Sequence, residues 1–121
     1  MAKRILMIDD EPDVLEMLGN RLVANHYEVI SASTGLEGLE KAQNEKPDLI
    51  LLDVMMPGMD GLEVLKRLKS SNLTRNIPVL IISAKVQKES IQKAIAAGAV
   101  DYFVKPFPVS DLLGKIQKMV A

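Results

Sequence analysis

Polar residues with the chemistry of phosphate and metal sites stand directly after short apolar runs of this 121-residue chain: Asp9, Asp10 and Glu11, then Asp53, Ser83 and Lys105. Two carboxylates about 4 Å apart repel each other by roughly 4 kcal/mol at an effective dielectric constant of about 20, so a cluster of these acids favours a bound cation. Oxygen ligands in small number suit Mg²⁺, which keeps several waters and often shares a phosphate. A carboxylate beside Mg²⁺, with a hydroxyl and an ammonium nearby, can act as a nucleophile and form an acyl phosphate.

Apolar segments predict the five strands that would bring these residues together. The runs at 5–8, 49–52 and 79–82 lack alternation, as expected of parallel strands that are buried on both faces. Residues 27–32 and 102–104 are weaker candidates for the second and fifth strands. In an open parallel sheet, ligands bind outside the carboxyl ends of the strands, which is where the polar residues would gather.

Helix signals separate the predicted strands. Pro12 suits the first turn of a first helix, and Thr34 with Glu37 forms a capping box before a second helix that runs to about residue 45. Asp60 and Glu63 can cap a third helix in the same way.

A fourth helix is expected over about 86–97, with a stop at Gly98, and a fifth from about 109 to the end of the chain. Five strand–helix pairs in strict alternation predict a doubly wound α/β fold, with a five-stranded parallel sheet and helices on both faces. We expect one domain to account for residues 1–121.

Composition narrows the class of protein. The formal net charge is −1, which does not suggest a nucleic-acid partner, and the absence of cysteine excludes disulfides and thiolate sites. No apolar stretch approaches 18 residues, so no membrane span is expected, and the first apolar run is far too short for a signal peptide. A cytoplasmic domain is the default expectation.

Four motifs together resemble the bacterial response-regulator receiver domain. They read "ILMIDDEPDV", "PDLILLDVMMPGMDG", "VLIISAK" and "GAVDYFVKPF", and they stand in the order and at the spacing of that family. The resemblance covers the whole chain and implies the flavodoxin-like receiver fold, of a stand-alone, single-domain type. It also implies a phosphorylation-dependent switch of two-component signalling rather than an enzyme that turns over an external substrate.

The resemblance implies a role for each matching acidic position. Asp53 would be the phosphoacceptor, Asp10 a direct ligand of Mg²⁺, and Asp9 an acid that acts on the metal through water. The backbone carbonyl of Met55 would complete the protein's share of the metal shell.

Further roles are implied for three residues near the later strands. Ser83 would be the switch hydroxyl that bonds the phosphoryl group, and Lys105 would bind a phosphoryl oxygen. Tyr102 would be the aromatic residue that swings inward after phosphorylation. The Lys105–Pro106 peptide bond is expected to be cis, because proline makes that isomer accessible.

The implied partners are a sensor histidine kinase or a histidine phosphotransfer protein that presents phosphohistidine. We expect no effector domain within residues 1–121, so output would pass through contact with a further protein. The fourth helix is polar over most of its surface, and we expect Ile91 and Ile95 to anchor it only weakly. Together with the strand of Tyr102 and the fifth helix it would form the partner face.

Three alternatives compete with this interpretation. A phosphatase of the haloacid dehalogenase type also uses an aspartate after a strand, but it requires a second acid where this chain has Met55. A flavin-binding module on the same fold would need aromatic residues for stacking, and the chain has two Phe, two Tyr and no Trp. A pseudo-receiver would bind partners without phosphorylation, which the complete set of acids, serine and lysine argues against.

Overall fold

The computed structural model describes residues 2–120. In that range, strands and helices alternate strictly: β1 (Arg4–Ile8), α1 (Pro12–Ala24), β2 (Glu28–Ala32), α2 (Gly35–Glu45), β3 (Leu49–Leu52), α3 (Gly61–Ser70), β4 (Val79–Ser83), α4 (Lys88–Ala96), β5 (Asp101–Val104) and α5 (Val109–Val120). All strand pairs are parallel, and the order across the sheet is β2-β1-β3-β4-β5. The predicted doubly wound α/β fold is confirmed.

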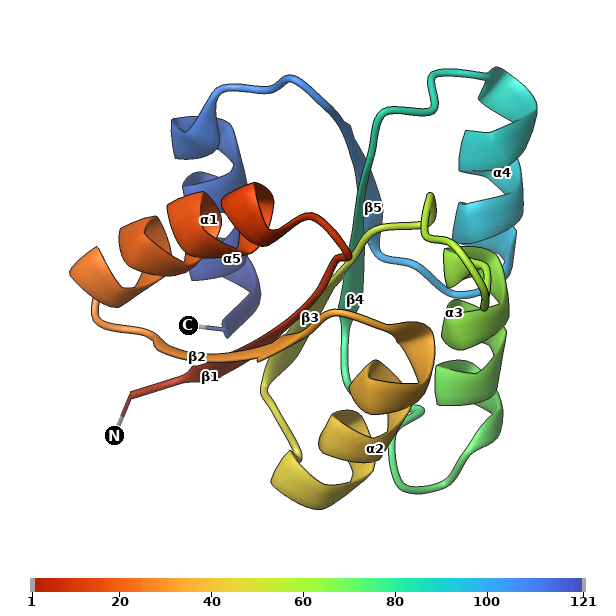
Figure 1. Cartoon of the computed structure of the whole chain (residues 1–121), viewed down its shortest axis with the longest axis horizontal. Helices are drawn as coiled ribbons and strands as arrows, with labels where there is room; N and C mark the ends of the chain where they lie inside the picture. Colours follow the sequence, from red (N-terminus) through yellow and green to blue (C-terminus); the bar gives the residue numbers. More distant parts are fainter. Residues whose placement is uncertain (1, 121) are drawn as a thin grey trace.

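The helices form a layer on each face of the sheet, with α1 and α5 on one side and α2, α3 and α4 on the other (Figure 1). Successive side chains of a strand point to opposite faces, so Leu6 and Ile8 pack beneath the second layer while Ile5 and Met7 pack beneath the first. Both sets are buried, which explains why the apolar runs of the central strands show no alternation.

The sheet register decides which polar residues meet. Ile8 of β1 pairs with Leu52 of β3, so the residues that follow them, Asp9 and Asp53, leave the sheet side by side. Ser83 is the last residue of β4 and pairs with Val104 of β5, immediately before Lys105. The sheet register therefore brings these polar residues together at the carboxyl ends of the strands, which is the edge predicted from the sequence.

Side chains cap α2 and α3, although not in identical ways. The Thr34 hydroxyl accepts the Glu37 amide at 3.1 Å, and the Glu37 carboxylate accepts the amide of Ser33 at 2.8 Å. Asp60 caps α3 by accepting the Leu62 amide at 2.8 Å. Glu63 does not complete a second capping box, because its carboxylate pairs with Arg67 one turn further along the helix, at 3.1 Å.

The fourth helix is shorter and packs differently than expected. It begins at Lys88, two residues later than expected, and Ile91 is half-buried, as expected of a weak anchor. Ile95 was wrongly expected to anchor the helix, because the buried residue is Ala94 and Ile95 is 44% exposed. Neighbouring residues of a helix point about 100° apart, so the side that presents Ala94 to the core turns Ile95 toward solvent. Gly98 follows the C-cap residue of α4 and has a φ of +113°, the positive φ typical of a glycine that ends a helix.

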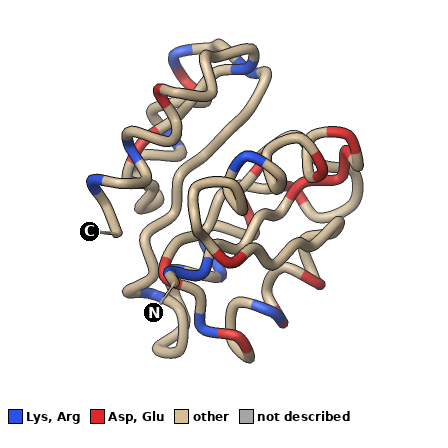
Figure 2. The backbone as a smooth tube through the Cα atoms, turned by 90° about the vertical axis from the view of Figure 1, so that its left-hand side faces the viewer, with Lys and Arg blue, Asp and Glu red and all other residues tan. Residues whose placement is uncertain are grey.

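Charges of both signs occur on several elements of the side of the molecule seen in Figure 2, and the described residues in that view form no continuous basic stripe. Within residues 2–120, no helix combines the length and the apolar character needed to cross a bilayer.

Candidate functional site

Four carboxylates meet at the carboxyl ends of β1 and β3. One oxygen from each of Asp9, Asp10, Glu11 and Asp53 lies within 4.8 Å of the others. Asp9 and Asp53 are only 1% and 2% exposed, whereas Asp10 is half-buried and Glu11 is exposed. The structure thus brings together the acids that follow the first and third strands in the sequence, Glu11 included.

Lys105 supplies the ammonium group of this cluster. Its Nζ lies 3.1 Å from Oδ2 of Asp9, 3.1 Å from Oδ2 of Asp53 and 3.6 Å from the carboxylate of Glu11. A single lysine therefore bridges the two buried acids, and the cluster still carries more negative than positive charge. The expected cis bond between Lys105 and Pro106 is present.

Backbone amides hold the second oxygen of each buried acid. Oδ1 of Asp53 accepts the amide of Met55 at 2.8 Å, and Oδ1 of Asp9 accepts the amide of Glu11 at 2.9 Å. Each buried carboxylate is thus oriented from both sides, by an amide on one oxygen and by Lys105 on the other. The side chain of Met55 points away from the core and is 48% exposed.

Burial raises the pKa of the Asp53 carboxyl above its ordinary value, and the charge of Asp9 adds to the rise. The Met55 amide and the Lys105 ammonium act in the opposite direction without cancelling it. For Lys105, burial alone would lower the pKa, but the hydrogen bond to Asp9 and the charge of Asp53 outweigh burial and raise it. The lysine therefore stays charged beside the acids.

The donor chemistry of the cluster fits a hard divalent cation. The side-chain oxygens that Asp9, Asp10, Glu11 and Asp53 offer are all carboxylate oxygens, which suit Mg²⁺ better than a softer metal. Within the described part of the chain, Lys105 is the one positive partner of these acids, which leaves an excess of negative charge that a cation would balance.

Ser83 and Tyr102 are linked through a residue that sequence reasoning missed, Lys85. The buried Ser83 hydroxyl accepts the amide of Lys85 at 3.2 Å, and the half-buried Tyr102 donates its phenolic hydrogen bond to the Lys85 carbonyl at 3.0 Å. No sequence signal distinguishes Lys85 from other exposed lysines, because its role here comes from its backbone.

Gly61 was also missed. Its amide donates to the carbonyl of Val54 at 3.2 Å, and a Cβ at this position would clash with the Cα of Val54 and the carbonyl oxygen of Asp53. Only glycine lets the first turn of α3 pack against the chain that leaves Asp53. The turn between them has a positive φ at Gly58, +79°, which glycine adopts without strain.

Comparison with known proteins decides the family. The model of the response regulator receiver domain matches residues 5–117. The chain belongs to this family. As a receiver domain, it is a phosphorylation-dependent switch of two-component signalling. The phosphatase and flavin-binding alternatives are therefore set aside.

Two curated relatives come from Bacillus subtilis (strain 168). The alkaline phosphatase synthesis transcriptional regulatory protein PhoP is 40% identical over 120 residues, which cover 99% of this chain and 49% of PhoP. Sporulation initiation phosphotransferase F is 36% identical over 118 residues, which cover 98% of this chain and 94% of that protein. The receiver domain thus spans about half the length of PhoP and nearly all of the phosphotransferase.

Solved structures show the same fold. The chemotaxis protein CheY4 of Vibrio cholerae superimposes with a TM-score of 0.92 at 33% identity, covering 98% of this chain and 99% of that one. A CheY-like receiver domain protein of Methanospirillum hungatei gives a TM-score of 0.93 at 33% identity, covering 99% and 94%.

Proposed function

We propose that Asp53 accepts a phosphoryl group from the phosphohistidine of a sensor kinase or a histidine phosphotransfer protein. The observation that carries this proposal is the position of the Asp53 carboxylate, which is 2% exposed and held between the Met55 amide at 2.8 Å and Lys105 at 3.1 Å. A carboxylate oriented in this way lies at the end of a strand, where a phosphoryl donor can approach from the sheet edge.

Asp9, Asp10, Asp53 and the Met55 carbonyl would hold Mg²⁺. When bound, this ion supplies positive charge against the phosphoryl oxygens during transfer. The all-oxygen donor set and the excess negative charge of the cluster support this assignment.

In the transfer step, a carboxylate oxygen of Asp53 attacks phosphorus as the P–N bond to the histidine breaks. The histidine nitrogen leaves with the electron pair of that bond, and a P–O bond to Asp53 forms. Lys105 would neutralise a phosphoryl oxygen. The Ser83 hydroxyl oxygen accepts a hydrogen bond from the Lys85 amide. The Ser83 hydroxyl hydrogen is not used in this bond, so it can be donated to another phosphoryl oxygen.

The phosphorylated state would end in the same site. Water attacks phosphorus, the P–O bond to Asp53 breaks, and the carboxylate and inorganic phosphate are released. The protein would thus catalyse its own phosphorylation and dephosphorylation without turning over an external substrate.

The proposed output surface comprises α4, β5 and α5. Two exposed apolar residues support a protein contact there, Ile95 at 44% and Val100 at 47% exposure. Phosphorylation would shift a two-state equilibrium in which Tyr102 leaves its bond to Lys85 and swings inward. The kinase and the target would meet this receiver in the cytoplasm, the compartment expected from its sequence.

Incubation with acetyl phosphate or phosphoramidate and Mg²⁺, followed by intact mass spectrometry, tests the proposal. We expect one added phosphoryl group, which Asp53→Asn abolishes and which Asp111→Asn, a change of an exposed acid in the first turn of α5, leaves in place. No adduct on the wild-type chain would favour a pseudo-receiver, and an adduct that survives Asp53→Asn would contradict the assignment of the acceptor.

A further inference from the structure

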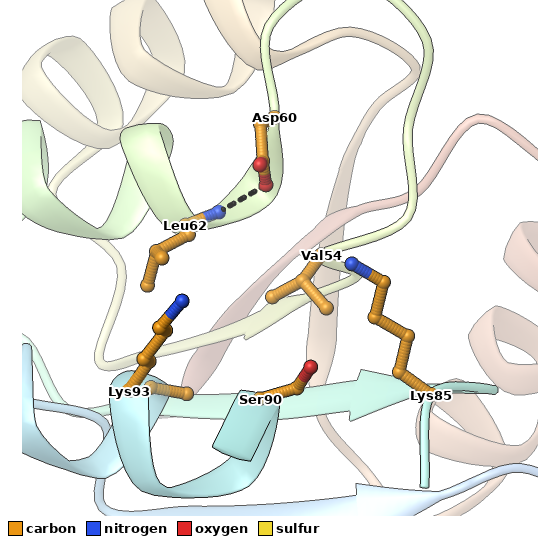
Figure 3. Close-up of a pocket in the computed structure, with 7 residues that line it drawn as sticks. Val54, Asp60, Leu62, Lys85, Ser90 and Lys93 are labelled. Carbon is orange, nitrogen blue, oxygen red and sulfur yellow. Dashed lines mark hydrogen bonds between the residues drawn. The ribbon is translucent and has the colours of Figure 1, made fainter. Parts of the chain in front are cut away.

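A hollow lies between α3 and α4 (Figure 3), and none of the four acids of the cluster lines it. Its volume is about 140 Å³, and Val54 and Leu62 contribute apolar surface. Polar side chains reach it from three places in the chain: Asp60 at the start of α3, Lys85 after β4, and Ser90 and Lys93 on α4.

A more open groove of about 390 Å³ continues from this hollow along the two helices. The hollow and the groove share Leu62 and Lys93, and the groove adds Lys66, Ala96 and Ala97. We call the hollow and the groove together the α3–α4 cleft. It combines a small recess, an apolar surface and three lysines within a chain whose net charge is −1.

The lysines of the α3–α4 cleft are poorly neutralised. Among residues 2–120, the ammonium groups of Lys66 and Lys85 make no hydrogen bond or ion pair. Lys93 pairs with Glu89 at 3.1 Å, but the two side chains are 61% and 80% exposed, so this pair contributes little and is readily exchanged.

The one carboxylate that lines the recess already has a partner. Asp60 accepts the Leu62 amide at 2.8 Å as the cap of α3, which ties it to its own helix. An incoming anion therefore meets two ammonium groups and the Ser90 hydroxyl beside the single carboxylate of Asp60, so positive charge exceeds negative charge in the recess. It competes with the exposed ion pair of Lys93.

Size restricts the ligand. A recess of about 140 Å³ is well below the roughly 300–1,000 Å³ of sites for drug-sized molecules, so it accommodates one side chain or a small anion and not a nucleotide. The groove that leads out of the recess can hold the chain on either side of such a side chain. Ala96 and Ala97 give the groove an apolar surface against which apolar residues of that chain can pack.

We propose that the α3–α4 cleft binds an acidic peptide segment of a protein partner. One Asp or Glu carboxylate of that segment would enter the recess and accept charge-assisted hydrogen bonds from Lys85 and Lys93 and a further bond from Ser90. Flanking acids would meet Lys66 along the groove. Charge complementarity of this kind contributes specificity and a faster association rate.

Lys85 connects the cleft to the phosphorylation site. Its amide donates to Ser83, its carbonyl accepts from Tyr102, and its side chain lines the recess. Val54, which also lines the recess, follows Asp53 directly in the chain. This part of the inference rests on the proposed function. If phosphorylation moves Ser83 and Tyr102, it changes the affinity for the peptide, and the peptide changes the stability of the phosphorylated state by the same factor.

Titration of the full chain by NMR tests the binding site without any phosphodonor. The probe is the acetylated pentapeptide Glu-Glu-Leu-Glu-Glu, and the control probe has Gln in place of each Glu. We expect saturable shift changes at Lys85, Ser90 and Lys93 with the acidic peptide only. Lys85→Gln should weaken binding about tenfold, as expected for loss of a hydrogen bond to a charged group, and Ser90→Ala more modestly.

Lys118→Gln on α5 is the matched control, because it removes the same charge outside the cleft and should leave the affinity within about twofold. Equal losses in Lys85→Gln and Lys118→Gln would reduce the effect to general electrostatics and overturn the site. Equal binding of the Gln peptide would do the same. If sodium acetate or inorganic phosphate produced the same shifts at the same concentration, the site would be one for small anions, and the peptide partner would be rejected.

A second titration with acetyl phosphate and Mg²⁺ tests the coupling, with mass spectrometry as the readout of phosphorylation. A changed peptide affinity in the phosphorylated chain supports the coupling. An unchanged affinity in a chain that carries the phosphoryl group overturns the coupling and leaves the proposed function intact. A chain that gains no phosphoryl group counts against the proposed function, whereas the first titration still decides the binding site.

Discussion

Nζ of Lys105 lies 3.1 Å from Oδ2 of Asp53, and the lysine side chain is only 19% exposed. Arginine keeps the charge, but its planar and longer head cannot occupy the same point between Asp53 and Asp9. We predict that Lys105→Arg still binds Mg²⁺ but loses the NMR shift changes that follow addition of a phosphodonor. Lys115→Arg, which alters an ion pair with Asp101 at 3.3 Å, should switch normally. Normal switching by Lys105→Arg would disprove the role assigned to this lysine.

Within residues 2–120, Asp10 is the one acid of the cluster that makes no ion pair, because Lys105 pairs with Asp9, Glu11 and Asp53 instead. Neutralising it should relieve repulsion without breaking a salt bridge. We predict that Asp10→Asn raises the melting temperature in chelator by a few degrees, given that about 1 kcal/mol shifts a domain of this size by roughly 4 °C. The same change should weaken Mg²⁺ binding in a titration.

Asp9→Asn is the informative comparison for that experiment. It also removes one negative charge, but it takes a buried partner from Lys105 at 3.1 Å, so its melting temperature should rise less than that of Asp10→Asn, or fall. Unchanged Mg²⁺ affinity in Asp10→Asn would refute its assignment as a metal ligand.

Gly61 and Gly114 offer a matched pair of glycines at helical positions. A Cβ on Gly61 would clash with the backbone of Val54 and Asp53, whereas a Cβ on Gly114 of α5 meets no atom within 4 Å. We predict that Gly61→Ala lowers the free energy of unfolding by about 1–3 kcal/mol and that Gly114→Ala raises it by about 0.5–1 kcal/mol. Chemical denaturation measures both, and a stable Gly61→Ala protein would show that α3 can shift away from the loop.

Met55 lies two residues after Asp53, the proposed phosphoacceptor. Its backbone amide donates a hydrogen bond to the Asp53 carboxylate, and its side chain is exposed. A thioether is a poor hydrogen-bond partner for an attacking water, and its bulk would partly screen the phosphoryl group proposed on Asp53. We predict that Met55→Asn shortens the lifetime of the phosphorylated state about tenfold, which requires about 1.4 kcal/mol of barrier change. Phosphate release after removal of the donor, at fixed Mg²⁺, measures this lifetime. Equal or slower release would mean that Met55 only packs the loop.

The fold could be predicted from the sequence because its signals are local. Unbroken apolar runs mark β1, β3 and β4, whose residues are almost wholly buried, and the caps at Thr34 and Asp60 mark helix starts within one residue. Topology then places Asp9, Asp53, Ser83 and Lys105 at one edge, so the members of the site follow from strand order and need no side-chain detail.

The remaining features depend on side-chain geometry that no local pattern carries. Whether Ala94 or Ile95 faces the core depends on the rotation of α4 against the sheet, and the sequence pattern favoured the larger residue. That Lys105 pairs with Asp9 and Asp53, each at 3.1 Å, and not with the neighbouring Asp10 is likewise a matter of side-chain geometry. The α3–α4 cleft draws on separate segments, so its lysines look like ordinary surface residues until the structure assembles them.

The sheet register also determines when the chain can first take part in signalling. The proposed site needs one group from the end of each of four neighbouring strands, and Lys105, after β5, is the last of them to be synthesised. A chain still emerging from the ribosome has no complete site until residue 105 has been added and β5 has paired with β4. A slip of one residue between β1 and β3 would separate Asp9 from Asp53 by about 3.3 Å along the strand and turn one of them to the opposite face. Copies in which β5 is missing or the sheet is out of register would therefore lack the proposed site and could not take up a phosphoryl group on Asp53.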